Sequence, residues 1–265
     1  MKSRVRDAPS LAARSLRLFD LLGIDVARLW LVVRGFPKYV GDCRRYRKLS
    51  GPSSLKLNVR DLQPVLWESR EPAGTARGHY FWQDLWAARR IFQRQPGTHV
   101  DVASRLDGFV AHLLTFMRVT YVDIRPVPEP VDGLTVLQGD LTELSCLALQ
   151  SVESLSCLHA IEHVGLGRYG DRISPDSWKL AITNLKKVLA PSGVLYLSVP
   201  VGSERLRFNA HRVFAPRTIL EAAQPLQLAS FSLVDDEGRF HPEGDLEAAS
   251  KLRFGCGCFE LVNQA

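Results

Sequence analysis

From residue 98 onward, short apolar runs alternate with segments in which apolar residues recur at helical spacing. The apolar runs predict strands over 98–102, 119–123, 134–138, 153–158, 194–199, 226–234 and 252–262. The helical spacing predicts helices over 106–117, 176–189 and 216–223. Pro191-Ser192-Gly193 is expected to close the second helix, and Pro216 to lie in the first turn of the third. Strands that alternate with helices predict an α/β domain with a mostly parallel sheet of about seven strands, helices on both faces and an antiparallel last strand.

The N-terminal part of the chain has a different pattern. Residues 10–49 carry an apolar stripe interleaved with arginines, which predicts mostly helix. Two interpretations stay open: an amphipathic helix on an anionic membrane surface, or a helix packed on the main domain with a solvated basic face. Residues 51–78 are rich in Pro, Gly and Ser, whereas 79–95 resume a helical pattern. We therefore divide the chain into a basic helical extension (1–50), a linker or irregular cover (51–78) and an α/β domain (79–265).

Positive charge is concentrated in the first 50 residues. They contain 12 of the 34 Lys and Arg residues but only four of the 28 Asp and Glu, so this segment carries +8 and the remainder −2. The main domain is therefore not expected to bind nucleic acid, and an anionic partner would meet the N-terminal segment. Five scattered cysteines do not form a disulfide pattern. With no signal peptide and no apolar run near ~20 residues, we expect a cytoplasmic protein, at the inner face of the membrane if the basic helix binds lipid.

Acidic or small residues follow four successive predicted strands. Asp101 leads into the small turn Ala103-Ser104, and Asp123, Asp140 and His159 end the next three strands. Because ligands of open α/β sheets bind at the carboxyl ends of the strands, we expect these residues to surround one site. A small turn lets backbone N–H groups approach a ligand, Asp123 can accept both ribose hydroxyls, and Asp140 can accept an adenine amino group. The set predicts an adenosine-containing cofactor; the alternative is that these residues only cap turns.

Three titratable residues are candidates for catalysis. Glu162 and His163 lie in a glycine-rich loop after the fourth strand and could do acid/base work. Alternatively, Glu162 caps a helix and His163 is a satisfied surface group. His211 lies between two phenylalanines and is our first choice as base, because a histidine with a pKa near 6.5 suits removal of a proton from a hydroxyl. A structural role for His211 is the alternative.

Two segments contain residue types that bind metals. Cys256-Gly257-Cys258 places two thiols on one face of a predicted strand, but no second Cys or His pair follows at metal spacing. Asp235-Asp236 with His241 could hold a divalent cation, although a plain polar loop is the favoured interpretation. We therefore expect no metal site.

Residues 75–262 contain a series of segments that resembles a known family. The segments HVDVASRLDGFVAHL, VTYVDIRP, QGDLTEL, LHAIEHVGLGRYGD, LKKVLAPSGVLYLSVPVG, FNAHRVF, VDDEG and FGCGCF are similar to the family known as domain of unknown function 268 (DUF268). That family resembles class I S-adenosylmethionine-dependent methyltransferases and often occurs near bacterial surface-polysaccharide genes. The resemblance implies a Rossmann-like class I methyltransferase fold and S-adenosyl-L-methionine as cofactor. It also implies a small-molecule or glycan acceptor, with O-methylation of a sugar or surface-polysaccharide precursor.

The resemblance also implies a role for each strand end. The backbone around Ala103–Arg105 would hold the methionine end, Asp123 the ribose, and Asp140 with Leu141 the adenine. His211 or His163 would be the base, with Glu162 as its orienter. The candidate cofactor-binding residues are Asp101, Ala103, Ser104, Arg105, Gly108, Asp123, Ile124, Asp140, Leu141 and His159.

The turn departs from the family pattern D-x-G-x-G-x-G at two positions. Ala103 replaces the first glycine and Arg105 the second. If position 103 takes a positive φ, alanine costs about 1 kcal/mol relative to glycine. Arg105 adds bulk, although its guanidinium could pair with a methionine carboxylate. These departures motivate a second hypothesis, a non-catalytic scaffold or regulator in surface-glycan assembly. A nicotinamide-dependent sugar oxidoreductase ranks last, because it predicts a glycine-rich turn that the chain lacks.

Overall fold

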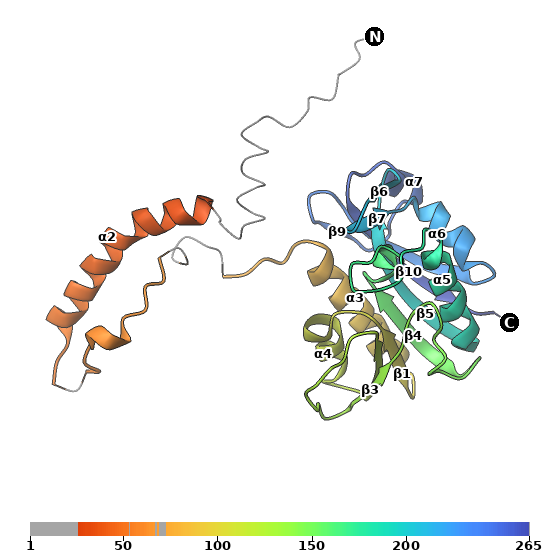
Figure 1. Cartoon of the computed structure of the whole chain (residues 1–265), viewed down its shortest axis with the longest axis horizontal. Coiled ribbons are helices and arrows are strands. Elements are labelled where there is room, and N and C mark those ends of the chain that lie inside the picture. Colours follow the sequence, from red (N-terminus) through yellow and green to blue (C-terminus); the bar gives the residue numbers. More distant parts are fainter. Residues whose placement is uncertain (1–25, 53, 67, 69–72, 265) are drawn as a thin grey trace, which may run out of the picture. The chain divides into compact units, whose positions relative to one another are not determined.

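The computed structural model of the chain describes residues 26–52, 54–66, 68 and 73–264 (Figure 1). Residue contacts divide the chain into two compact units, Met1–Thr75 and Ala76–Ala265.

The first unit contains helix α2 (Val26–Leu49) and the short 3₁₀ turn η1 (Val59–Asp61). The chain after α2 returns close to the helix, because a Cβ on Gly35 would lie 2.4 Å from the carbonyl oxygen of Leu66. Residues 10–25 of the predicted helix lie outside the described residues. Within the part that the structure describes, none of the helices combines the length and the apolar character that crossing a bilayer requires. The membrane-surface interpretation of residues 10–49 stays a prediction.

The second unit is built on one twisted sheet. Its strands lie in the order β3-β2-β1-β4-β5-β10-β8-β9, with β3, β2, β1, β4 and β5 parallel and β10 antiparallel to both of its neighbours. The strands are β1 (His99–Val102), β2 (Val119–Asp123), β3 (Leu134–Gln138), β4 (Val152–Leu158), β5 (Leu189–Val201), β8 (Gln227–Val234), β9 (Phe240–His241) and β10 (Gly255–Val262). The predicted α/β class and the antiparallel last strand are confirmed. The two-residue β9 adds an eighth strand to the seven expected.

Helices cover both faces of the sheet, as Figure 1 shows. On one face, α5 (Ser177–Val188) and α6 (Pro216–Ala223) pack on alternate residues of β5 that include Leu195 and Leu197. On the other face, α3 (His79–Arg94) packs on the residues between them, including Tyr196. Because successive side chains of a strand point to opposite faces, β5 is buried on both sides. This burial explains the apolar run over residues 194–197 of the strand.

Four segments differ from the sequence-based expectations. The helix predicted over 106–117 is a π-helical turn, η3 (Leu106–Val110), followed by the short α4 (Ala111–Leu113). Pro191-Ser192-Gly193 lies inside the bounds of β5, where the register with β4 shifts between Val152 and Ser154. The segment therefore forms an irregularity within the strand. Two short strands, β6 (Arg205–Arg207) and β7 (His211–Val213), form an unpredicted hairpin, and α7 (Leu246–Ser250) lies between β8 and β10.

Candidate functional site

A cavity lies at the carboxyl ends of β1, β2, β3 and β4. It encloses about 910 Å³ when the open solvent at its mouth is included. The sheet order reverses between β1 and β4, which is where open α/β sheets bind ligands. Its walls are formed by Tyr80, Val102, Ala103, Ser104, Arg105, Asp123, Ile124, Arg125, Gly139, Asp140, Leu141, His159, Ala160, His163, Val164, Tyr169 and Asp171. Eight of the ten candidate cofactor-binding residues are among them.

The turn after β1 holds its shape through Ala103 and Ser104. Ala103 has φ 62°, in the left-handed region, and its N–H donates to Val122 O at 2.8 Å. Position 103 therefore does take the positive φ at which alanine costs about 1 kcal/mol relative to glycine. Ser104 Oγ donates to Asp101 at 2.6 Å and accepts from Leu158 N at 2.9 Å, which ties the turn to the end of β4.

Asp101 lies beneath this turn, outside the cavity wall. Its carboxylate accepts hydrogen bonds from Ser104 N, Ser104 Oγ and Ser156 Oγ, and its side chain is fully buried. Burial raises the pKa of Asp101 from 3.8 to about 7, even though the serine hydrogen bonds act in the opposite direction. Asp101 therefore has a structural role: it fixes the turn and does not touch a ligand in the cavity.

The raised pKa of Asp101 predicts a pH-dependent stability. The folded protein binds the proton more tightly than the unfolded chain, so this contribution is full below pH 3.8 and is lost as pH rises through about 7. We expect Asp101→Asn to gain stability relative to the wild type by on the order of 2 kcal/mol between pH 5 and pH 8. Urea unfolding of both proteins at each pH measures this difference. A difference that stays constant would show that Asp101 titrates normally.

Asp123, at the end of β2, is held by Arg125. Oδ1 accepts from Arg125 N at 2.8 Å and Nε at 3.0 Å, and Oδ2 accepts from Tyr121 Oη at 2.9 Å and Arg125 Nη2 at 2.8 Å. These contacts lower the pKa of Asp123 despite its burial, so the group is a carboxylate at neutral pH. Arg125 also lies 4.8 Å from the ring centre of Tyr169. Four hydrogen bonds fill the acceptor sites of a carboxylate, so a ligand hydroxyl must displace Arg125 to reach Asp123.

Asp140 keeps one oxygen free for a ligand. Oδ1 accepts from Thr142 N at 2.7 Å and Thr142 Oγ1 at 2.8 Å, which caps the turn after β3. Oδ2 has no hydrogen-bond partner among the described residues. Leu141 and Ile124 add apolar wall on either side. One free acceptor between apolar side chains suits a flat heterocycle with an amino group.

The loop after β4 brings three titratable residues together. His159, with φ 50°, places Nδ1 2.6 Å from Glu162 Oε1, and Glu162 is almost fully buried. His163 Nδ1 lies 2.6 Å from Ala210 O, and its Nε2 lies 3.7 Å from Glu162 Oε1. Because Ala210 O can only accept, Nδ1 of His163 carries the proton and Nε2 is free to accept one. Burial lowers the pKa of His163, so the ring is neutral at pH 7.

Four candidate residues do not line the cavity. Asp101 lies under the turn, and Glu162 lies behind His159 and His163. Gly108 faces α3, where a Cβ would lie 2.6 Å from Asp84 Oδ2. His211 is on the β6–β7 hairpin, with its ring centre 4.9 Å from that of Phe254, and its buried Nε2 has no hydrogen-bond partner among the residues that the structure describes. Of the two histidines predicted as the base, His163 lines the cavity and His211 does not.

The sequence interpretation missed Tyr80, Arg125, Tyr169 and Asp171 as wall residues. Tyr80 comes from helix α3, and the search for polar residues at the ends of strands does not include helices. Asp171 could have been found from the sequence, because it lies in the glycine-rich loop after the fourth strand. In the structure its carboxylate accepts backbone N–H groups from Gly165, Gly167 and Tyr169. These hydrogen bonds lower the pKa of Asp171 and fix the loop that forms one side of the cavity.

The loop around Asp235 supports the polar-loop interpretation. Asp235 accepts from Glu237 N, Arg239 N and Nε, and contacts His241 Nε2 at 2.8 Å. Asp236 accepts from Arg253 N and Phe254 N. Both carboxylates hold the loop together, and their oxygens are engaged by protein donors.

Comparison with known proteins supports this assignment of the fold. Residues 135–235 match the family described as "Caenorhabditis protein of unknown function, DUF268", a narrower span than the 75–262 of the sequence resemblance. Among curated proteins, none matches the chain.

Three solved structures show the same architecture. A Burkholderia thailandensis 1,6-didemethyltoxoflavin-N1-methyltransferase, with S-adenosylhomocysteine bound, is 16% identical over 69% of this chain and 79% of its own, with a TM-score of 0.50. A Galdieria sulphuraria protein described as "a putative sarcosine dimethylglycine methyltransferase" is 15% identical over 69% of this chain and 86% of its own, with a TM-score of 0.50. The [4+2]-cyclase SpnF is 12% identical over 72% and 85%, with a TM-score of 0.51. The chain has the Rossmann-like fold of class I methyltransferases, a fold that one of these relatives uses for a different reaction.

Proposed function

We propose that this protein is an S-adenosylmethionine-dependent methyltransferase that methylates a hydroxyl of a sugar or polysaccharide precursor. One observation carries the proposal: the cavity at the sheet's switch point joins the turn of Ala103, the carboxylate of Asp123 and the free oxygen of Asp140. These three elements match the methionine, ribose and adenine parts of the cofactor in their order along the sheet. The sugar acceptor rests on the sequence resemblance.

The residues of the cavity fit the proposed cofactor. The backbone of Ala103–Arg105 would hold the methionine end, Asp123 the ribose hydroxyls, and Asp140 Oδ2 with Leu141 the adenine. Arg105 is half-exposed and paired with Asp107, so its guanidinium can exchange partners at little cost. When bound, S-adenosylmethionine supplies an electrophilic methyl group on its sulfonium.

Ribose can bind at Asp123 only when Arg125 moves away. Removing the Arg125 side chain should therefore change the affinity for S-adenosylmethionine. Arg125→Ala is expected to tighten S-adenosylmethionine binding by a few fold, up to about 1 kcal/mol, the worth of a partly exposed ion pair. Titration calorimetry of the variant against the wild type measures the change. Weaker binding by Arg125→Ala would instead mean that Arg125 contacts the cofactor.

His163 is the residue proposed to move the proton of the acceptor. Its unprotonated Nε2 can accept the proton of an acceptor hydroxyl while the oxygen attacks the methyl group. Glu162, 3.7 Å away, favours the imidazolium that results. Nδ1–H stays on Ala210 O and keeps the ring in place. The protein's contribution is thus alignment of the acceptor and removal of one proton.

Methyl transfer tests the proposal directly. Full-length protein is incubated with S-adenosylmethionine and a panel of nucleotide-linked and free sugars, and S-adenosylhomocysteine is quantified. The proposal expects one acceptor class to release S-adenosylhomocysteine, and His163→Gln to slow this by about 10²–10⁴-fold while cofactor binding is kept. Transfer to a nitrogen acceptor alone would refute the assigned acceptor class.

A non-catalytic role in glycan assembly is the second candidate. The four hydrogen bonds on Asp123 favour it, because they occupy the group that would bind ribose. Measurement of cofactor binding distinguishes the methyltransferase from the non-catalytic protein. A non-catalytic protein in which Arg125 occupies Asp123 would bind S-adenosylmethionine only after Arg125→Ala.

A further inference from the structure

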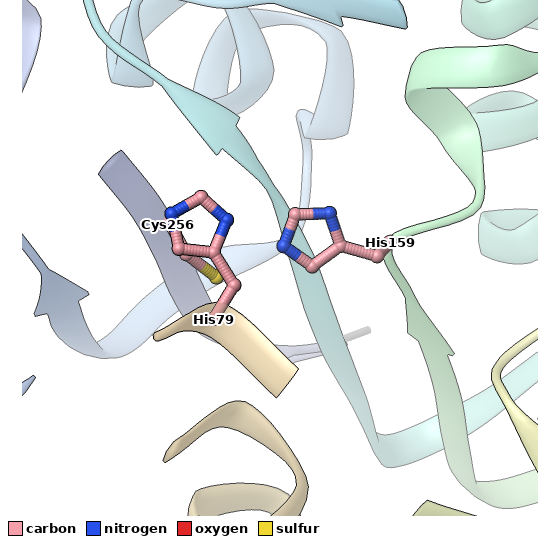
Figure 2. Close-up of side chains that lie close together, drawn as sticks. All are labelled: His79, His159 and Cys256. Carbon is pink, nitrogen blue, oxygen red and sulfur yellow. The ribbon is translucent and has the colours of Figure 1, made fainter. Parts of the chain in front are cut away.

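Two histidines and a cysteine converge beside the cavity from three distant segments. His79 begins α3, His159 follows β4, and Cys256 lies on β10. One potential ligand atom from each lies within 4.8 Å of the others (Figure 2). Atoms bound to one zinc ion lie about 3–4 Å apart, given bond lengths of about 2.0–2.3 Å. The three side chains are therefore within a small adjustment of a shared ion.

An unpartnered nitrogen points to a ligand at this cluster. The side chain of His159 is only 5% exposed, and its buried Nε2 has no hydrogen-bond partner within the described part of the chain. Its other nitrogen, Nδ1, is held by the buried Glu162 carboxylate at 2.6 Å. A carboxylate on one nitrogen with the other left free is the arrangement of a metal-binding histidine, in which the outer partner fixes tautomer and orientation.

His79 repeats this arrangement with a different outer partner. Its Nε2 lies 3.2 Å from the carbonyl oxygen of Phe254, so Nε2 carries the proton and Nδ1 is left as a possible ligand. Figure 2 shows the two imidazoles side by side, next to the sulfur of Cys256. Their planes differ by 18°, so one ring must turn before both nitrogens can face one ion.

We propose that His79, His159 and Cys256 form a binding site for a divalent transition-metal ion, with Zn²⁺ as the preferred ion. Two imidazoles and one thiolate are ligands that suit zinc, and three protein ligands leave a fourth position open. Each imidazole binds the metal through the nitrogen opposite its hydrogen-bonded one, and the Cys256 thiol gives one proton to solvent as its sulfur binds the metal. The proposal replaces the expectation of no metal site, and it stands independently of methyl transfer.

Cobalt substitution tests the site on the intact protein. Full-length protein is stripped with a chelator and titrated with Co²⁺, then with Zn²⁺. We expect one Co²⁺ per chain, with the thiolate-to-metal absorption of sulfur ligation, and its displacement by Zn²⁺. Absence of thiolate absorption in the folded wild-type protein overturns the proposal.

Variants locate the site within the cluster. Glu162→Gln is expected to lower Zn²⁺ affinity by about 10–100-fold, as loss of an outer partner does, and Cys256→Ser by more while abolishing the thiolate absorption. Cys146→Ser, which changes an exposed thiol, serves as the matched control and should leave the Zn²⁺ affinity and the thiolate absorption unchanged. Should Cys256→Ser fold poorly, His79→Ala on the half-buried ring replaces it. Wild-type affinity in the folded ligand variants overturns the proposal.

Discussion

Replacing Asp123 with alanine is expected to weaken S-adenosylmethionine binding by about 10- to 100-fold. The carboxylate is the group at the end of β2 that can accept both ribose hydroxyls, and hydrogen bonds to a charged group contribute about 1.5–3 kcal/mol. Titration calorimetry on the variant and the wild type measures the loss. The thermal unfolding midpoint of each protein shows whether the variant keeps its fold.

Asp176→Asn is the matched control for this loss. Asp176 is an exposed acid that pairs with Lys179 outside the cavity, so its replacement removes the same charge without touching the site. We expect it to bind S-adenosylmethionine as the wild type does. Equal weakening by both variants would mean that overall charge, and not the Asp123 contact, sets the affinity.

Replacing Gly165 with alanine is expected to lower the free energy of unfolding by about 3 kcal/mol. Gly165 has φ 78°, and an added Cβ would lie 2.1 Å from the carbonyl oxygen of Ser174. The positive φ costs about 1 kcal/mol, and forced overlap costs a further 1–3 kcal/mol. Urea unfolding measures the change, and because this loop forms a wall of the cavity, cofactor affinity should fall with it.

Gly170→Ala separates the two causes within the same loop. Gly170 has φ 83°, but an added Cβ would meet nothing within 4 Å. We expect this variant to lose only about 1 kcal/mol. If the two variants were equally destabilised, the close approach of Ser174 to Gly165 would not be the reason.

The strand order around the site was predictable because it follows local rules. Each of the first four parallel strands has a polar residue within two positions of its carboxyl end, and parallel strands bring such ends to one edge of the sheet. The sequence also indicated that Ala103 could take a positive φ, because the turn after the first strand needs a small residue where its backbone approaches a ligand. The structure has φ 62° at this position.

Other parts of the site depend on contacts that no local pattern contains. Arg125 reaches back to Asp123 because of the turn after β2, and neither residue type alone predicts that pairing. His211 lies outside the cavity wall because it is on the β6–β7 hairpin, whose three-residue strands are too short to give a strand pattern in the sequence. Cys256 meets His79 and His159 only because β10 inserts between β5 and β8, which brings residues distant in sequence together. Spacing rules for metal sites therefore could not find this cluster.

Titration calorimetry of S-adenosylmethionine into the full-length wild-type protein tests the central claim, that the cavity beside Asp123 and Asp140 binds this cofactor. We run it at two temperatures, because the enthalpy of binding changes with temperature and cannot vanish at both. The predicted result is one site per chain with a dissociation constant on the order of 1 μM, about −8 kcal/mol. No heat at either temperature, at concentrations where a known methyltransferase gives a full isotherm, would contradict it.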